Sequence, residues 1–132
     1  MAEGLSTTLV SNWLNTLRAA GAAFGPVAAE YAQLHTANPG AAGTTAISVG
    51  STTRVIFTHA ASSGGSALAL TGTNPAWTNG GTSETITDIS VWTASSGGTF
   101  LFSVALTASK AWASGDTFTL TSLGVSLTPQ AS

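Results

Sequence analysis

The apolar residues of the chain are organised around a predicted β-hairpin over residues 85–107. Its second strand alternates most clearly, because every second residue is apolar and the intervening residues are smaller or more polar. The expected inward row is Phe100, Phe102, Val104 and Leu106, and the outward row is Leu101, Ser103, Ala105 and Thr107. In the first strand, one face is expected to carry Ile89 and Val91, and the other Ile86, Asp88, Ser90 and Trp92. A Ser-Ser-Gly-Gly loop joins the strands, and its glycines supply the positive φ angles that such a loop needs.

The N-terminus carries the one predicted helix. Ser6 is a suitable N-cap, and an apolar stripe with helical spacing follows it, formed by Leu9, Val10, Trp13, Leu14 and Leu17. Arg18 is expected in the last turn, where a cation suits the helix dipole, and Gly21 is expected to end the helix. The stripe predicts a helix packed on its own sheet, or alternatively an arm whose Trp13 face docks on a neighbouring subunit.

Short β-rich runs punctuated by Gly, Ser and Pro fill the rest of the chain. Besides the hairpin, strands are predicted within residues 31–36, 52–59, 66–71, 117–121 and 123–127, with residues 37–45, 72–81 and 108–115 as loops or connectors. The spacing predicts an all-β fold, an antiparallel β-sandwich or small jelly-roll-like barrel of about seven to eight strands with one N-terminal α-helix. We expect a single domain, in which a helical segment (residues 1–22) packs on the β-sandwich (residues 23–132) or on a neighbour.

Charged residues make up only 6% of the 132 residues, and the formal net charge is −2. Three basic side chains cannot neutralise the several phosphates that nucleic-acid binding requires, so nucleic acid is not an expected partner. A weakly charged surface has little electrostatic protection against association, which favours a subunit of an assembly. No apolar run approaches the roughly 18 residues of a membrane span, and the N-terminus lacks the positive charge of a secretory signal.

The search for reactive groups predicts no catalytic, cofactor-binding or metal-binding residue. His35 and His59 are isolated in sequence from any Cys or carboxylate pattern that would suggest a metal site, and no G-x-S-x-G motif occurs. On an extended strand Glu84 and Asp88 would lie about 13 Å apart, too far for a glycosidase pair. Both are therefore expected to be solvated acids at a strand edge.

Aromatic residues offer two alternatives. Tyr31, Trp77, Trp92 and Trp112 could line a sugar-binding surface, or they could belong to the core or to a subunit interface. The second alternative is favoured, because no cluster of polar hydrogen-bonding residues accompanies them in the sequence.

Several segments resemble a family of small proteins from tailed bacteriophages that are labelled tail fibre or head-decoration proteins. The segments are YAQLHT (residues 31–36) with PGAAG (39–43), ISVW (89–92), GTFLF (98–102) and ASGDT (113–117). Relatives often carry Asp before the loop proline, where this chain has Asn38, so no role of an acid is carried over to that position. The resemblance implies a β-rich virion component of a double-stranded DNA phage and supplies no catalytic residue.

We therefore expect a non-enzymatic virion structural protein that is made in the host cytoplasm. The first expectation is a decoration or cement protein on the capsid exterior, whose partners are the major capsid protein and copies of itself, possibly as a trimer. The alternative is a tail-fibre or minor tail module that contacts tail proteins or a host surface glycan. The residues expected at an interface are Leu9, Trp13, Leu17, Asn38, Pro39 and Trp77.

Overall fold

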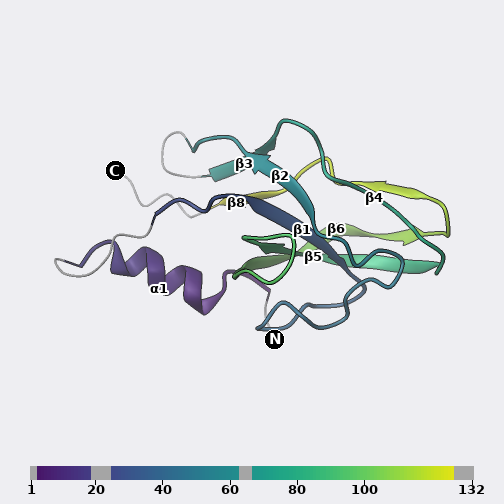
Figure 1. Ribbon diagram of the computed structural model, residues 1–132, viewed down its shortest axis with the longest axis horizontal. Coiled ribbons are helices and arrows are strands. Elements are labelled where there is room, and N and C mark those ends of the chain that lie inside the picture. The colour runs from purple at the N-terminus through teal and green to yellow at the C-terminus, as the bar shows by residue number, and fades with distance from the viewer. Residues whose placement is uncertain (1–2, 19–24, 63–66, 127–132) are drawn as a thin grey trace.

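The computed structural model describes residues 3–18, 25–62 and 67–126 and contains one helix and eight strands in these ranges (Figure 1). Helix α1 (Thr7–Asn15) comes first. It is followed by β1 (Glu30–His35), β2 (Val55–His59), β3 (Ala67–Thr71), β4 (Ala76–Thr78), β5 (Glu84–Trp92), β6 (Phe100–Trp112), β7 (Thr117–Thr119) and β8 (Gly124–Ser126). The predicted all-β class with an N-terminal helix is confirmed.

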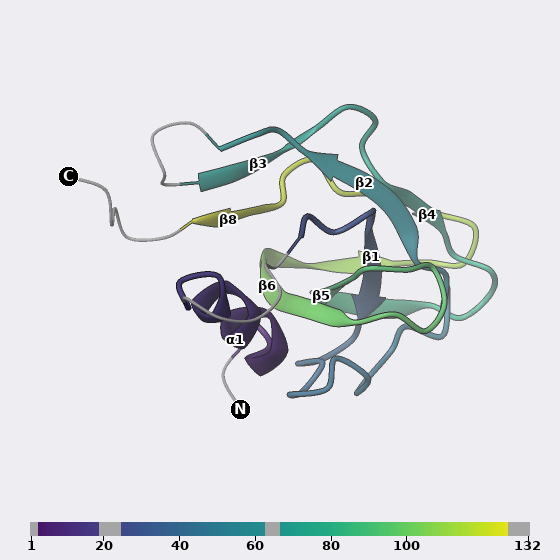
Figure 2. The same cartoon turned by 60° about the vertical axis from the view of Figure 1, so that its left-hand side comes forward.

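Six strands form one antiparallel sheet in the order β6-β5-β1-β2-β3-β8, and β4 pairs with β7 in a small second sheet. The large sheet curls, so that β2, β3 and β8 lie over β1, β5 and β6 (Figures 1 and 2). The curl encloses one apolar core. Its buried members are Leu9, Ala32, Leu34, Phe57, Trp77, Ile86, Ile89, Val91, Leu101, Phe102, Trp112, Phe118, Leu120 and Leu123.

The predicted hairpin is formed by β5 and β6, but the faces of β6 differ from the prediction at its start. Trp92 pairs with Phe100 and Val91 pairs with Phe102, so the register shifts at Leu101. This bulge places Phe100 beside Trp92, with the ring centroids 5.4 Å apart, rather than in one row with Phe102. A second irregularity, between Ile86 and Asp88, leaves Ile86 in the apolar core instead of on the polar face.

The prediction of an outward-facing row on β6 is also partly wrong, because two of its members, Leu101 and Ser103, are buried. The N-terminal segment runs along the free edge of β6 as an additional short strand. The amide of Ser6 donates to the carbonyl of Leu101 (2.7 Å), and the amide of Ser103 donates to the carbonyl of Gly4 (2.9 Å). Pairing over a large sequence distance therefore covers an edge that the local pattern leaves exposed.

Helix α1 begins as predicted, since the Ser6 hydroxyl accepts a hydrogen bond from the amide of Leu9 at 3.2 Å. It ends earlier than predicted, at Asn15, so Arg18 does not lie in its last turn. Gly21 and the proposed boundary at residue 22 lie outside the described residues. Leu9 anchors the helix in the core and Trp13 packs against it, which supports packing on the protein's own sheet.

Two segments that were predicted as loops or connectors contain β-strand. Strand β6 continues to Trp112, where a connector was expected, because Glu84–Ile86 of β5 pair with Lys110–Trp112. The loop of residues 72–81 contains β4, in which Trp77 pairs with Phe118 of β7. Of the predicted strand over residues 123–127, the structure describes β8, and Leu127 lies outside the described residues.

We expect Phe102→Ala to lower the free energy of unfolding by about 3–5 kcal/mol, because the ring is buried and a small side chain leaves a cavity. Ile56→Ala, at a half-exposed site on β2, is the control and should cost much less. Urea denaturation of both variants measures the difference. Equal losses would contradict the burial of Phe102.

Candidate functional site

The residues expected at an interface lie in three different environments. Leu9 is buried in the core and Trp13 is half-buried, whereas Leu17, beyond the end of α1, is 83% exposed. Leu14, in the last turn of α1, is 62% exposed. The C-terminal end of the helix therefore exposes apolar surface, while its start belongs to the core.

Asn38 and Pro39 lie in the loop that follows β1. Pro39 is fully buried, and the Asn38 side chain donates to the Glu3 carboxylate at 3.3 Å. At Gly43 in the same loop, φ is +71° and an added Cβ would lie 2.5 Å from the ring of Phe100, so only glycine fits. The loop is thus held closely on the protein, and Pro39 does not lie on the surface.

The tryptophans of β4, β5 and β6 are core residues. Trp77, Trp92 and Trp112 are 3%, 6% and 1% exposed, and each indole N–H donates a hydrogen bond inside the chain. Trp77 accordingly does not offer its ring to a partner. Burial also removes these three rings from any sugar-binding surface, which agrees with the favoured assignment to the core.

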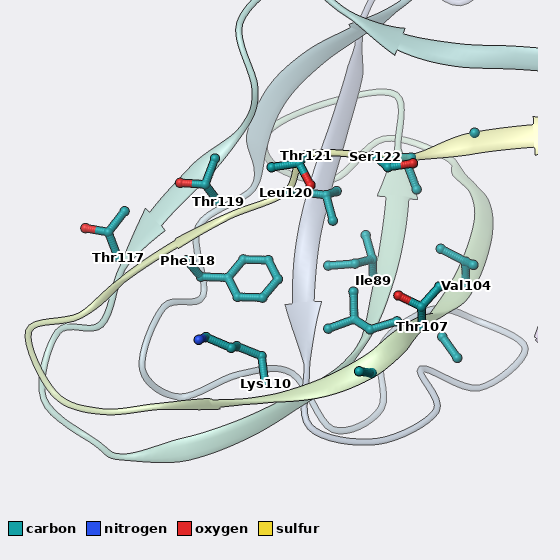
Figure 3. Close-up of a pocket in the computed structure, with 15 residues that line it drawn as sticks. Ile89, Val104, Thr107, Lys110, Thr117, Phe118, Thr119, Leu120, Thr121 and Ser122 are labelled. Carbon is teal, nitrogen blue, oxygen red and sulfur yellow. The ribbon is translucent and has the colours of Figure 1, made fainter.

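A surface groove of about 600 Å³ lies between β6 and the segment that connects β7 to β8 (Figure 3). Its apolar floor includes Ile89, Phe118 and Leu120, all of which are buried. Threonine and serine hydroxyls surround this floor, from Thr107, Thr117, Thr119, Thr121 and Ser122. Lys110 is the one charged side chain among the lining residues.

The lining of the groove consists mostly of apolar and hydroxyl-bearing side chains. General acid–base catalysis needs a titratable group close to neutrality beside a reacting group, and the lining residues include no carboxylate, imidazole or thiol. Its apolar floor can instead bury an apolar group, and the surrounding hydroxyls can form hydrogen bonds to polar groups beside that group.

A second set of polar residues is buried on the opposite face of β1, β5 and β6. His35 is fully buried, and its Nδ1 lies 2.7 Å from the carbonyl of Thr45. Because a carbonyl only accepts, Nδ1 carries the proton and Nε2 accepts from the Ser90 hydroxyl at 2.7 Å. The Ser90 oxygen in turn accepts from the indole of Trp92 at 2.8 Å. Every polar atom of this chain of hydrogen bonds is satisfied when His35 is neutral.

Arg54 anchors the hairpin loop between β5 and β6. Its guanidinium lies 3.7 Å from the centre of the Trp92 ring and donates to the carbonyls of Ala94 and Gly97 at 3.2 and 2.6 Å. Gly97 and Gly98 have φ angles of +61° and +72°, as predicted for this loop. Burial lowers the pKa of Arg54 from its ordinary value without removing its charge.

The two carboxylates that were expected to be solvated at a strand edge have other positions. Glu84 is half-buried and accepts hydrogen bonds from the Ser48 hydroxyl and from the amides of Val49 and Gly50 (3.2 and 3.0 Å), which fixes the loop before β2 to β5. Asp88 is only 4% exposed, in the middle of the sheet between β1 and β6. The prediction was wrong because β5 is an inner strand with loops over its polar face.

Among the residues that the structure describes, no three His, Cys, Asp or Glu side chains gather into a group that could hold a metal ion. Within the same residues, no helix is long and apolar enough to cross a membrane.

His59 of β2 contacts Glu30 at the start of β1, with 2.9 Å between Nδ1 and Oε2. This contact ties the two strands together.

A curled antiparallel sheet with one short N-terminal helix defines the chain as an all-β module. Comparison with known protein families identifies the family of the chain. The family described as Podophage GP4 fiber I protein gp80 matches residues 4–128, nearly the whole chain, and the protein belongs to this family. It is therefore a structural protein of a phage virion, and the predicted resemblance is confirmed. No match to a curated protein was found.

We expect the free energy of unfolding to decrease as the pH falls below about 6.5, because burial lowers the pKa of His35 in the folded state. Because the folded chain binds the His35 proton less tightly than the unfolded chain does, the stability that neutral His35 contributes is fully present above the unfolded pKa. This contribution is lost as the pH falls through the pKa of the folded state. NMR titration of the His35 ring measures this directly. The His35 ring should titrate at a lower pH in the folded chain than in the unfolded chain, and a titration midpoint at or above the ordinary histidine value would contradict the assigned hydrogen bonds.

Proposed function

We propose that this protein is a non-enzymatic building block of a fibre on the phage virion, where it contacts copies of itself and neighbouring tail proteins. The observation that carries the proposal is the match of a fibre-protein family to residues 4–128. The expectation of a capsid decoration protein becomes the rival hypothesis, because the family description names a fibre.

The surface supports assembly through neutral contacts. Leu14 and Leu17 expose most of their side chains at the end of α1, and they are two of the four large hydrophobic residues that are most exposed in the described chain. The loop over residues 37–45 contains no charged residue. Association must then come from burial of apolar area and from neutral hydrogen bonds, which salt does not screen. We propose a closed homo-oligomer, with a cyclic trimer as the favoured form.

The location in the virion can be tested with gold-labelled antibodies and electron microscopy of intact particles, combined with quantitative mass spectrometry. A fibre subunit should be labelled at the tail or at a fibre and should be present in a small number of copies per particle. Label over the whole head, with copy numbers comparable to that of the major capsid protein, would instead establish decoration and reject the fibre proposal.

We expect the double variant Leu14→Ser/Leu17→Ser to weaken self-association by about 10- to 100-fold, since it removes two leucine side chains from the contact. The matched control is Val49→Ser/Ile56→Ser, which removes two other exposed apolar side chains and should keep the wild-type association constant. Sedimentation equilibrium measures both, at low and at high salt. Association of the wild type that collapses in moderate salt would contradict assembly through neutral contacts.

A further inference from the structure

A small apolar pocket lies between α1 and the β3–β8 pair, which stands above the helix in Figure 2. Leu9 and Trp13 of α1 line one side of it. Leu68 of β3 and Val125 of β8, which pair across the two strands, line the other side. Trp13, Leu68 and Val125 are only half-buried, so both sides of the pocket keep apolar surface that a further side chain can cover.

The pocket has the size and the lining that suit one aliphatic side chain. Its volume is about 170 Å³, and all of its lining residues except Glu30 are apolar. A protein cavity of about 150 Å³ lined by Leu, Ile and Phe accepts a benzene molecule, which is larger than the side chain of leucine. A leucine therefore fits into the pocket without displacing its walls.

A leucine without a binding site of its own lies just beyond α1. Leu17 is the most exposed large apolar side chain in the described chain, so it does not fill the pocket of its own molecule. Arg18, which follows it, is exposed as well. The other strands and loops offer no such pair, because Val49 has no basic neighbour, and Arg54 near Ile56 donates to the hairpin loop.

The one charged residue of the pocket complements Arg18. The Glu30 carboxylate contacts Nδ1 of His59 at 2.9 Å, and its side chain remains 18% exposed. A carboxylate has two oxygens that can each accept more than one hydrogen bond, so Glu30 can also accept from a guanidinium. An apolar pocket with a partly exposed carboxylate thus matches a leucine that is followed by an arginine.

We propose that Leu17 of one copy inserts into this pocket of a second copy, and that Arg18 beside it pairs with Glu30 of that copy. The proposal rests on the self-association proposed above and names the two surfaces that meet. Because these surfaces differ, each copy can give Leu17 to one neighbour and receive it from another, as in a closed ring. Burial of the leucine supplies most of the affinity, whereas the exposed charge pair mainly fixes the orientation, so the effect of salt stays small.

Cross-linking tests which positions meet. The chain contains no cysteine, so a disulfide in a mixture of the single variants Leu17→Cys and Leu68→Cys can only join two copies. We expect mild oxidation to link position 17 to position 68, as identified by mass spectrometry of the joined peptides. The protein concentration is set about 100-fold above the wild-type dissociation constant, which offsets the weaker binding of the shorter side chain.

The matched control mixes Val49→Cys with Leu68→Cys, because Val49 is another exposed apolar residue, and this mixture should form no link to position 68. If sedimentation shows that the mixed variants associate but positions 17 and 68 are not linked, the pocket is not the docking site and the assembly itself stands. A wild-type protein that stays monomeric in sedimentation would overturn this contact together with the proposed assembly.

A double-mutant cycle measures the same contact by sedimentation equilibrium. Leu17→Ala should weaken association about tenfold, and Leu68→Trp, which fills the pocket, should weaken it to a similar extent. The two changes together should weaken it no further, because both remove one contact. Arg18→Gln and Glu30→Gln should show the same lack of additivity with smaller effects. Fully additive losses in the first cycle would overturn the proposal, and if Leu68→Trp does not fold, the second cycle and the cross-link decide.

Discussion

The structure depends on the burial of β5 on both of its faces. From Asp88 to Trp92 every residue of this strand is buried, yet the two faces have opposite chemistry. Ile89 and Val91 face the apolar core, opposite Leu34 and Ala32 of β1. On the other face, Ser90 needs hydrogen-bond partners, because an unpaired polar group in the interior costs about 1–3 kcal/mol. One strand thereby fixes an apolar core inside the curled sheet and a hydrogen-bonded layer outside it.

Contacts inside the chain also hold most of the charged side chains in place. Of the eight charged side chains, five make contacts inside the chain. These are Glu3 with the amide of Ala105, Glu30 with His59, Arg54 with Trp92, Glu84 with the loop of residues 48–50, and Asp88 within the sheet. Arg18, Lys110 and Asp116 are exposed, as is Glu3, and Arg18 lies far from the other charged residues of the surface in the sequence except Glu3. Contacts with other virion proteins must therefore depend on shape and on neutral groups more than on charge.

Features set by local sequence could be predicted, whereas those set by distant loops could not. The Ser6 cap and the glycines of the hairpin loop depend on residues a few positions away, and both predictions are confirmed. The register shift at Leu101 depends on how β6 pairs with β5, and alternation alone cannot locate an extra residue. The burial of Asp88 was missed because alternation does not reveal that β5 lies between two other strands, with Asp88 beside His35 of β1 and Ala105 of β6. The groove beside Lys110 was missed for the same reason, since no local pattern marks the approach of β7 to β6.

Similar internal contacts hold the long loop between β1 and β2 in place. Thr45 accepts from His35, Glu84 holds the amides of Val49 and Gly50, and Gln33 donates to the carbonyl of Thr52 at 3.0 Å. The long loop between β1 and β2 is thus fixed at three separate points to side chains of β1 and β5. A loop that is already ordered loses little conformational entropy when a partner binds, so more of the contact energy is retained as affinity. In the assembly proposed above, this preorganisation would favour binding by a surface that has few charges available for attraction.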